Sequence, residues 1–501
     1  MLTPWTNASL MSKQPHSNLI LRGLVLLLAF DAVFILCFWG AGEAAFARSF
    51  IFDQAFPFES RIPFLPVWVL IYNSLWILGT LVFLQRPSPS DLRPVLWTIL
   101  FQIGIAVPIF VLFPTGQSFP RGELPTGWLG NFYRYTDLVN MQRNAFPSLH
   151  VTLALTFAAA ATPKCRPLWI KATLWLWSIA ICCSTVFIHE HHLADVAGGI
   201  ALSWVGVYFI MRPLQRGRAT LGLRHAADLR SLGMLWLFGM IAFLQWTGWL
   251  RSPWLFVLSL PLAFSACSIA HNHIHLPVFR SLRANTTFSC ILGFFSGQPP
   301  CAIVAAHNIR HHGMLGTRAD YVRPSVAPFR WNWLNVLAFP FAAMLGMYRD
   351  QILRRRPKIS TPPIKGAILQ RLIFYSGVAV LLIINPTATL AFLITPWIFG
   401  QLCIVGINLI QHQGCDPESH WNHSRNITGR PINWLLLNGG YHTAHHERPA
   451  LHWSQLPKFH RQEVTPHIDP RLDFRSLSAA ILTRMRTPAP TDSDTHTFPL
   501  R

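Results

Sequence analysis

Four short histidine groups in the second half of this 501-residue chain could do chemistry together. Three of them are boxes that each contain a pair of histidines four residues apart, and the fourth is a single histidine in the segment NLIQHQG at 408–414. Residues four apart lie on one face of a helix, so each box should aim two or three imidazoles at one point. The nine residues are His271, His275, His307, His311, His312, His412, His442, His445 and His446.

These nine nitrogen donors predict a metal centre that holds two ions. A structural zinc ion takes four ligands and often uses cysteine, but the nine cysteines of the chain form no Cys-x-x-Cys pair. Imidazole suits iron, and two iron ions account for nine ligands better than one zinc ion does. A gathering of histidines at a membrane interface is the alternative, and it fits His423, His452 and His460, which we expect to be structural.

A second pattern lies in the first half of the chain. The segment FPSLH ends at His150, and the segment STVFIHEHHLAD ends at Asp195, four residues after His191. On a helix that carboxylate can hold one nitrogen of His191 and make the other nucleophilic. His150 could protonate a leaving group, and Ser148 with helix-start N–H groups could cradle a phosphate. Helix capping explains either segment alone, but not both at one membrane face.

The composition of the chain indicates a membrane protein. The mean hydropathy is +0.34 and only 12% of the residues are charged, against about 25% in soluble domains. Ten apolar stretches approach the roughly 20 residues that a spanning helix needs. We therefore predict an all-α polytopic membrane protein, with a six-helix bundle followed by a four-helix domain that has a cytoplasmic cap. The predicted spans are 18–40, 65–85, 94–114, 148–163, 170–190, 193–212, 232–250, 253–270, 368–385 and 387–408, with re-entrant or interfacial segments at 287–306 and 326–348.

A basic stretch separates the two halves. We predict a first domain at 1–212, a cytoplasmic linker at 213–231, a second domain at 232–470 and a polar C-terminal tail at 471–501.

The net charge of +21 comes from basic residues that punctuate apolar segments, as the positive-inside rule produces. No basic stretch is interleaved with exposed aromatic residues, which argues against nucleic-acid binding. With the basic loops inside, the histidine boxes lie at the cytoplasmic side and His191 at the outer side. We expect an integral protein of a bacterial inner membrane.

The histidine boxes resemble those of the membrane fatty acid desaturase and hydroxylase superfamily over about 232–465. Members of that superfamily use a di-iron centre to activate O2, so the resemblance implies two iron ions held by the nine histidines. It also implies a fatty acyl or other membrane-lipid substrate. The HNIRHH spacing and the NLIQHQG element lean toward the alkane-hydroxylase-like branch, although Asn272 and Gln411 stand where that branch has acidic residues. Electrons would come from a ferredoxin, a rubredoxin or a cytochrome b5-like partner.

The first-half pattern resembles the type 2 phosphatidic acid phosphatase (PAP2) superfamily over about 60–212. The resemblance implies that His191 accepts the phosphoryl group, Asp195 orients it and His150 acts as acid and then base. Thr185 replaces the phosphate-binding arginine of the family, as in the inositol-phosphorylceramide-synthase-like branch. Arg121 or Arg143, in the loop before His150, could supply that charge.

Together the two patterns predict a bifunctional lipid-modifying enzyme. One half would desaturate or hydroxylate an acyl chain, and the other would hydrolyse a lipid phosphate or transfer a headgroup. One alternative keeps the oxidase and makes the first half an inactive lipid-binding module. Another is a metal or lipid transporter, which would place ionisable residues in broken helices at mid-membrane rather than at one surface.

Overall fold

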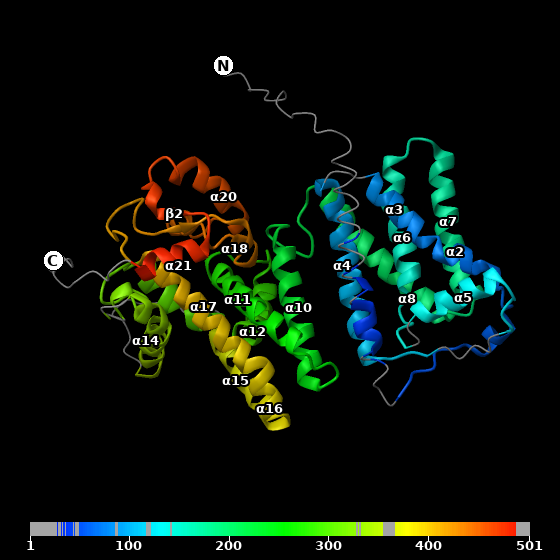
Figure 1. Cartoon of the computed structure of the whole chain (residues 1–501), viewed down its shortest axis with the longest axis horizontal. Coiled ribbons are helices and arrows are strands. Elements are labelled where there is room, and N and C mark those ends of the chain that lie inside the picture. The colour runs from blue at the N-terminus through cyan, green and yellow to red at the C-terminus, as the bar shows by residue number, and fades with distance from the viewer. Residues whose placement is uncertain are drawn as a thin grey trace, which may run out of the picture. The chain divides into compact units, whose positions relative to one another are not determined.

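The computed structural model describes residues 28, 32, 34–35, 37–43, 45, 50–85, 89–116, 122–140, 143–326, 329, 332–353 and 366–486. It divides into two compact units, Met1–Leu221 and Gly222–Arg501. Both units are almost wholly helical, as Figure 1 shows, so the predicted all-α class is confirmed. Within the described residues, eight helices are long and apolar enough to cross a membrane, four in each unit. They are Pro66–Leu84, Asp91–Leu112, Leu168–Phe187, Leu193–Gln215, Asp228–Thr247, Pro253–His275, Ala367–Ile384 and Pro386–His412.

Two of the ten predicted spans have no matching full-length helix among the described residues. Most of 18–40 lies outside the described residues. The stretch 148–163 forms only the 13-residue helix α6, Leu149–Ala161, which at 1.5 Å per residue is about 20 Å long and too short to cross the hydrocarbon core alone. The predicted re-entrant segment at 287–306 falls in a helix pair, Leu282–Ser296 and Pro300–His311, that is bent by 84°.

The first unit is built around α6. This helix packs against α3, α4, α7 and α8, and its Ala154, Ala158 and Ala160 are fully buried. Small side chains let neighbouring helix backbones approach closely, as is common inside membranes. The helices of this unit are η1 Pro57–Arg61, η2 Pro66–Trp68, α2 Val69–Asn73, α3 Leu75–Leu84, α4 Pro89–Leu112, α5 Trp128–Val139, α6, η3 Thr162–Lys164, α7 Leu168–Phe187, α8 Leu193–Gly206, η4 Val207–Met211 and α9 Arg212–Gln215.

The larger helical part of the second unit centres on α11, Pro253–His275, which packs against α10, Asp228–Thr247, and α17, Thr395–His412. The other helices of this part are α12 Leu282–Ser296, α13 Pro300–Val304, η5 Ala305–His311, η6 Pro324–Val326, α14 Asn332–Leu353, α15 Ala367–Ile384, α16 Pro386–Thr389 and η7 Leu390–Ile394. Thus α11 and α17 bring chain segments more than a hundred residues apart into direct contact.

Short elements follow α17 and form a compact cap. They are β1 Asn426–Ile427, α18 Arg430–Leu435, α19 His442–Glu447, η8 Trp453–Gln455, α20 Leu456–Phe459, η9 His460–Val464, η10 Pro470–Leu472, β2 Asp473–Phe474 and α21 Leu477–Arg486. The strands β1 and β2 pair in parallel, with Ile427 opposite Phe474. Ala480 of α21 is fully buried in a core cluster with Ile427. The packed domain therefore continues to about residue 486, beyond the boundary predicted at 470.

Candidate functional site

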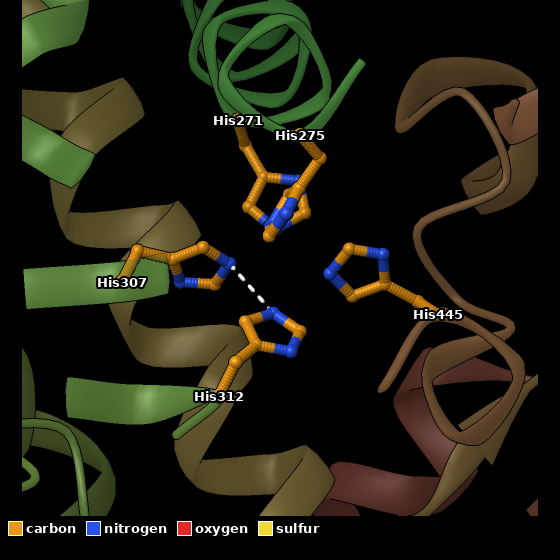
Figure 2. A group of neighbouring side chains, drawn as sticks. All are labelled: His271, His275, His307, His312 and His445. Atoms are coloured by element: carbon orange, nitrogen blue, oxygen red, sulfur yellow. Dashed lines mark hydrogen bonds between the residues drawn. The ribbon is translucent and has the colours of Figure 1, made fainter. Parts of the chain in front are cut away.

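All nine histidines of the predicted metal centre gather in the second unit, in two adjoining groups. In each group the possible ligand atoms lie within 4.8 Å of one another. Figure 2 shows the imidazoles of the first group pointing toward a common centre. The first group is His271, His275, His307, His312 and His445, and the second is His311, His412, His442 and His446. The rings of His312 and His446 stack at 4.3 Å between centroids and join the groups.

The helix carrying the second box does not have ordinary α spacing. Residues 305–311 form the π-helix η5, in which each turn takes up more than four residues. His307 therefore faces His312, with their Nε2 atoms 3.1 Å apart, while His311 joins the other group. The prediction that each box aims at a single point is thus wrong for the second box, because the local helix is wider than assumed.

The third box is also shared, for a different reason. It lies on the six-residue helix α19, where His442 and His446 are four residues apart and meet Nε2 to Nε2 at 3.1 Å. His445 points toward His271 of the first group, at 4.6 Å between ring centroids. Only the first box, His271 and His275 at the end of α11, keeps both its ligands in one group.

The nitrogen atoms fit metal ions better than they fit one another. Three Nε2 pairs lie 2.8–3.1 Å apart, which is the separation of two donors at right angles around an ion with bonds of about 2.1 Å. The Nε2 atoms of His275, His311 and His445 are buried and have no hydrogen-bond partner. Because an unpaired buried polar atom is unfavourable, these atoms fit a role as ligands of a cation. The cluster therefore fits two ions.

Groups behind the imidazoles hold them in place. Asp320 accepts a hydrogen bond from Nδ1 of His311 at 3.1 Å, and the carbonyl oxygen of His423 accepts one from Nδ1 of His412 at 3.0 Å. Such outer partners fix which ring nitrogen faces the metal. The nearby carboxylate of Glu447 instead contacts His420 and His423, neither of them in the two groups.

Burial favours the neutral form that binds a metal. In α19, which lies outside the candidate spans, burial and then neighbouring imidazoles hold the pKa values of His442, His445 and His446 well below the ordinary value. A neutral imidazole has a free nitrogen lone pair, so these side chains can bind a cation at neutral pH without first losing a proton.

A cavity of about 120 Å³ lies against both histidine groups. His271 and His307 of the first group and His442 of the second line it. Most of its wall is apolar, formed by Ile303, Val322, Met347, Ile404, Val405, Ile407 and Leu436. An apolar chain segment placed there would lie beside both candidate metal positions.

The second predicted site assembles in the first unit. Nδ1 of His191 lies 3.4 Å from Asp195, whose carboxylate also accepts hydrogen bonds from the His192 backbone and the Gln54 side chain. The rings of His150 and His191 are 6.4 Å apart between centroids. Both line a cavity of about 320 Å³. The structure thus brings the three predicted residues together, with the carboxylate fully buried.

Of the other three predicted residues of this site, Ser148 and Arg143 are not found in the cavity wall. Ser148 is buried outside the cavity wall, and its hydroxyl caps α6 by accepting from Val151 N at 3.4 Å. A phosphate-cradling role for that side chain is therefore not supported. Arg121 lies outside the described residues. Arg143 is partly buried, and its carbonyl oxygen accepts from Thr115 N.

Sequence reasoning missed three polar residues of this cavity. Tyr72 bonds His150 Nδ1 at 3.0 Å, and its ring stacks on His150 at 3.9 Å between centroids. Asn140 donates to Tyr72 at 3.1 Å and to Glu190 at 3.0 Å. Of the three, only Glu190 could have been found from the sequence, because it directly precedes His191 in the motif. The result is a linked polar wall around the histidine pair.

Comparisons with known proteins agree with both assignments. Residues 244–474 match the fatty acid desaturase family, and residues 58–209 match the PAP2 superfamily. Over 144 residues, covering 26% of this chain and 70% of the relative, the chain is 27% identical to a putative undecaprenyl-diphosphatase of Escherichia coli (strain K12).

Proposed function

Because the chain joins a PAP2-superfamily domain to a fatty acid desaturase domain, we propose that it is a bifunctional membrane enzyme that modifies lipids at two places. The second unit would desaturate or hydroxylate an aliphatic chain with O2, and the first would cleave or transfer a phosphorylated headgroup. The observation that carries the oxidative half is the two adjoining histidine groups beside an apolar cavity.

In the oxidative site, two iron ions held by the nine histidines would supply the activation of dioxygen that attack on an unactivated C–H bond requires. The protein's own contribution is orientation and the exclusion of water. Asp320 fixes the ring of His311, and the apolar wall aligns a chain segment beside His271 and His442. Two electrons for each turnover would come from a ferredoxin, rubredoxin or cytochrome b5-like donor, which the basic surface would attract.

In the first unit, Nε2 of His191 would attack the phosphorus atom while Asp195 holds Nδ1. His150, across the cavity, would donate a proton to the leaving oxygen and later take one from the acceptor. Tyr72 stacks on His150 and bonds its Nδ1, which leaves Nε2 for that transfer. This mechanism rests on the ring arrangement and on the likeness to PAP2 proteins.

A second reading of the first unit is a lipid-binding module without catalysis. The carboxylate of Glu190 lines the cavity, whereas none of the described residues that line it is a lysine or arginine. A dianionic phosphate next to a carboxylate is unfavourable unless a cation stands nearby. Arg121 remains the candidate for that charge.

Metal analysis and lipid profiling test the main proposal. Purified full-length protein should contain about two iron ions per chain. Deleting the gene from its host should remove an unsaturation or a hydroxyl group from a lipid class. An iron-free protein that gains no activity on reconstitution with Fe²⁺ would contradict the oxidative half, whatever the first unit does.

We also propose that the two sites lie on opposite sides of a bacterial inner membrane, with the histidine groups cytoplasmic. The distribution of basic loops supports this sidedness. Alkaline phosphatase fused after residue 128 should be active, and the same enzyme fused after residue 220 should be inactive. Equal activity at both positions would refute the opposed arrangement.

A further inference from the structure

The cavity beside the histidine groups contains polar atoms that the protein itself does not satisfy. Ser268 on α11 is 4% exposed, and its hydroxyl has no hydrogen-bond partner. One helical turn later, the amide nitrogen of Asn272 is buried and also lacks a partner. Both residues line the 120 Å³ cavity together with His271. Residues four apart on a helix share a face, so Ser268 and Asn272 lie side by side at one edge of this cavity.

The geometry explains why these atoms stay available. The amide oxygen of Asn272 lies 3.2 Å from Nδ1 of His271 and accepts its proton, so the NH2 group is left as a donor. Serine hydroxyls in helices often bond the carbonyl four residues earlier, as Ser265 does with Pro261 at 3.1 Å. Ser268, in the same helix, makes no such bond. Its hydroxyl can therefore donate or accept.

The rest of the cavity is suited to hydrocarbon. Apart from this edge, most of the exposed wall is apolar, with Ile303, Ile404 and Val405 among its residues. The amides of Asn408 and Gln411 also line the cavity, but they donate to the backbone carbonyls of Val322 and Gly439. Its volume of about 120 Å³ is close to the roughly 150 Å³ of an engineered apolar cavity that binds benzene. Only a few carbon atoms of a chain fit, so a polar substituent bound here would lie close to the attacked carbon.

We propose that this site takes a lipid whose chain carries a hydroxyl or carbonyl oxygen within a few carbons of the oxidised C–H bond. This inference rests on the proposed function and narrows its substrate class. A carbonyl oxygen would accept from both Asn272 and Ser268, and a hydroxyl would accept from the amide and donate to the serine. An unsubstituted chain would leave both groups unpaired, and a site with unpaired polar groups discriminates against such a ligand.

Binding to the purified full-length protein tests this inference without requiring turnover. The probes are 1-hexadecanol and hexadecane. Their affinities are compared from how the thermal unfolding midpoint of the protein in detergent rises with the concentration of each probe. Hexadecanol should bind more tightly. The Ser268→Ala variant should weaken hexadecanol binding by about three- to tenfold, the effect of one neutral hydrogen bond, and leave hexadecane binding unchanged.

Two controls make the result specific. Ser265→Ala removes a hydroxyl that bonds backbone carbonyls and does not line the cavity, so it should leave the preference intact. Ser268→Thr keeps a hydroxyl at this position, so it should show the same preference for hexadecanol over hexadecane as the unaltered protein. The inference is overturned if the unaltered protein binds both probes equally, or if Ser268→Ala keeps the preference for hexadecanol. Either result would mean that water, and not the substrate, satisfies the polar groups of Ser268 and Asn272.

Iron content separates this inference from the proposed function. Protein that holds iron but shows no preference for the alcohol disproves the substrate class and leaves the oxidase proposal standing. Protein that prefers the alcohol but neither retains nor accepts iron disproves the oxidase proposal and leaves a binding site for oxygen-bearing chains.

Discussion

His307 and His312 are five residues apart in the chain, yet their Nε2 atoms lie 3.1 Å from each other. The π-helix that holds them makes this possible, since an α-helix would pair His307 with His311 instead. The wider turn divides three consecutive ligands of one helix between two groups. One local irregularity therefore divides a single histidine face between two candidate metal positions.

This division predicts that the two groups lose metal separately. His275→Ala removes a ligand of the first group and His442→Ala a ligand of the second, so each variant should lose about one iron ion per chain. Metal content measured by mass spectrometry on purified protein checks this. The control is His420→Ala, whose side chain is 67% exposed and should leave iron content unchanged. Loss of both ions from every single variant would mean that the groups form one inseparable site.

The sequence was sufficient to single out the nine histidines, because their grouping in four short segments is visible whatever form the local helix takes. It could not predict how they divide, because a π-helix at 305–311 has no residue signature comparable to a proline or a cap. Tyr72 was missed for another reason. It lies inside an apolar span, Pro66–Leu84, where its ring looked like core packing until the fold placed its hydroxyl on His150.

Asp320 should control metal affinity without touching the metal. Its carboxylate accepts from Nδ1 of His311 and from the backbone N–H of Gly316 and Val322, and it is fully buried. Asp320→Asn keeps the shape of the side chain but removes its charge, which weakens the hydrogen bond that orients the His311 ring. We expect affinity for Fe²⁺ to fall by roughly 10- to 100-fold, as for other residues that orient ligands. Competition with a chelator measures it.

A matched variant tests whether that effect is specific. The side chain of Asp416 lies in an exposed turn and accepts a hydrogen bond from the backbone N–H of Glu418. Asp416→Asn should therefore leave iron affinity unchanged. Equal affinities for both variants and the unaltered protein would show that Asp320 serves the fold alone.

Gly400 should be needed for the packing of α17 against α11. A Cβ atom built at this position would lie 2.7 Å from the carbonyl oxygen of Ala263 and 2.8 Å from its carbon, both backbone atoms that cannot move aside easily. We expect Gly400→Ala to destabilise the second unit by about 1–3 kcal/mol, the usual cost of overpacking. Gly406→Ala, in the same helix, meets only a proline ring carbon at 3.3 Å and should cost less. Thermal unfolding in detergent compares the two variants, and equal midpoints would contradict the close-packing argument.

His191 decides between the two readings of the first unit. If it is the nucleophile, His191→Ala should lower phosphate release from a lipid phosphate or diphosphate by roughly a thousandfold or more, as removal of a nucleophile does elsewhere. Gln54→Ala should cause a smaller loss, because it removes only one of the hydrogen bonds that hold Asp195. Thr173→Ala, on an exposed face of α7, should have no effect.

The pattern across these variants carries more information than any single rate. A catalytic site predicts graded activity, with His191→Ala far below Gln54→Ala, while all three variants still bind lipid. A binding module predicts that none of them changes phosphate release, because the unaltered protein then releases no more phosphate than the variants do. A Glu190 variant also distinguishes a catalytic site from a binding module. If the Glu190 carboxylate repels phosphate, Glu190→Gln should raise the affinity of a binding module for lipid phosphate. In a working enzyme the same change should disturb the Asn140 and Tyr72 wall behind His150 and lower the rate.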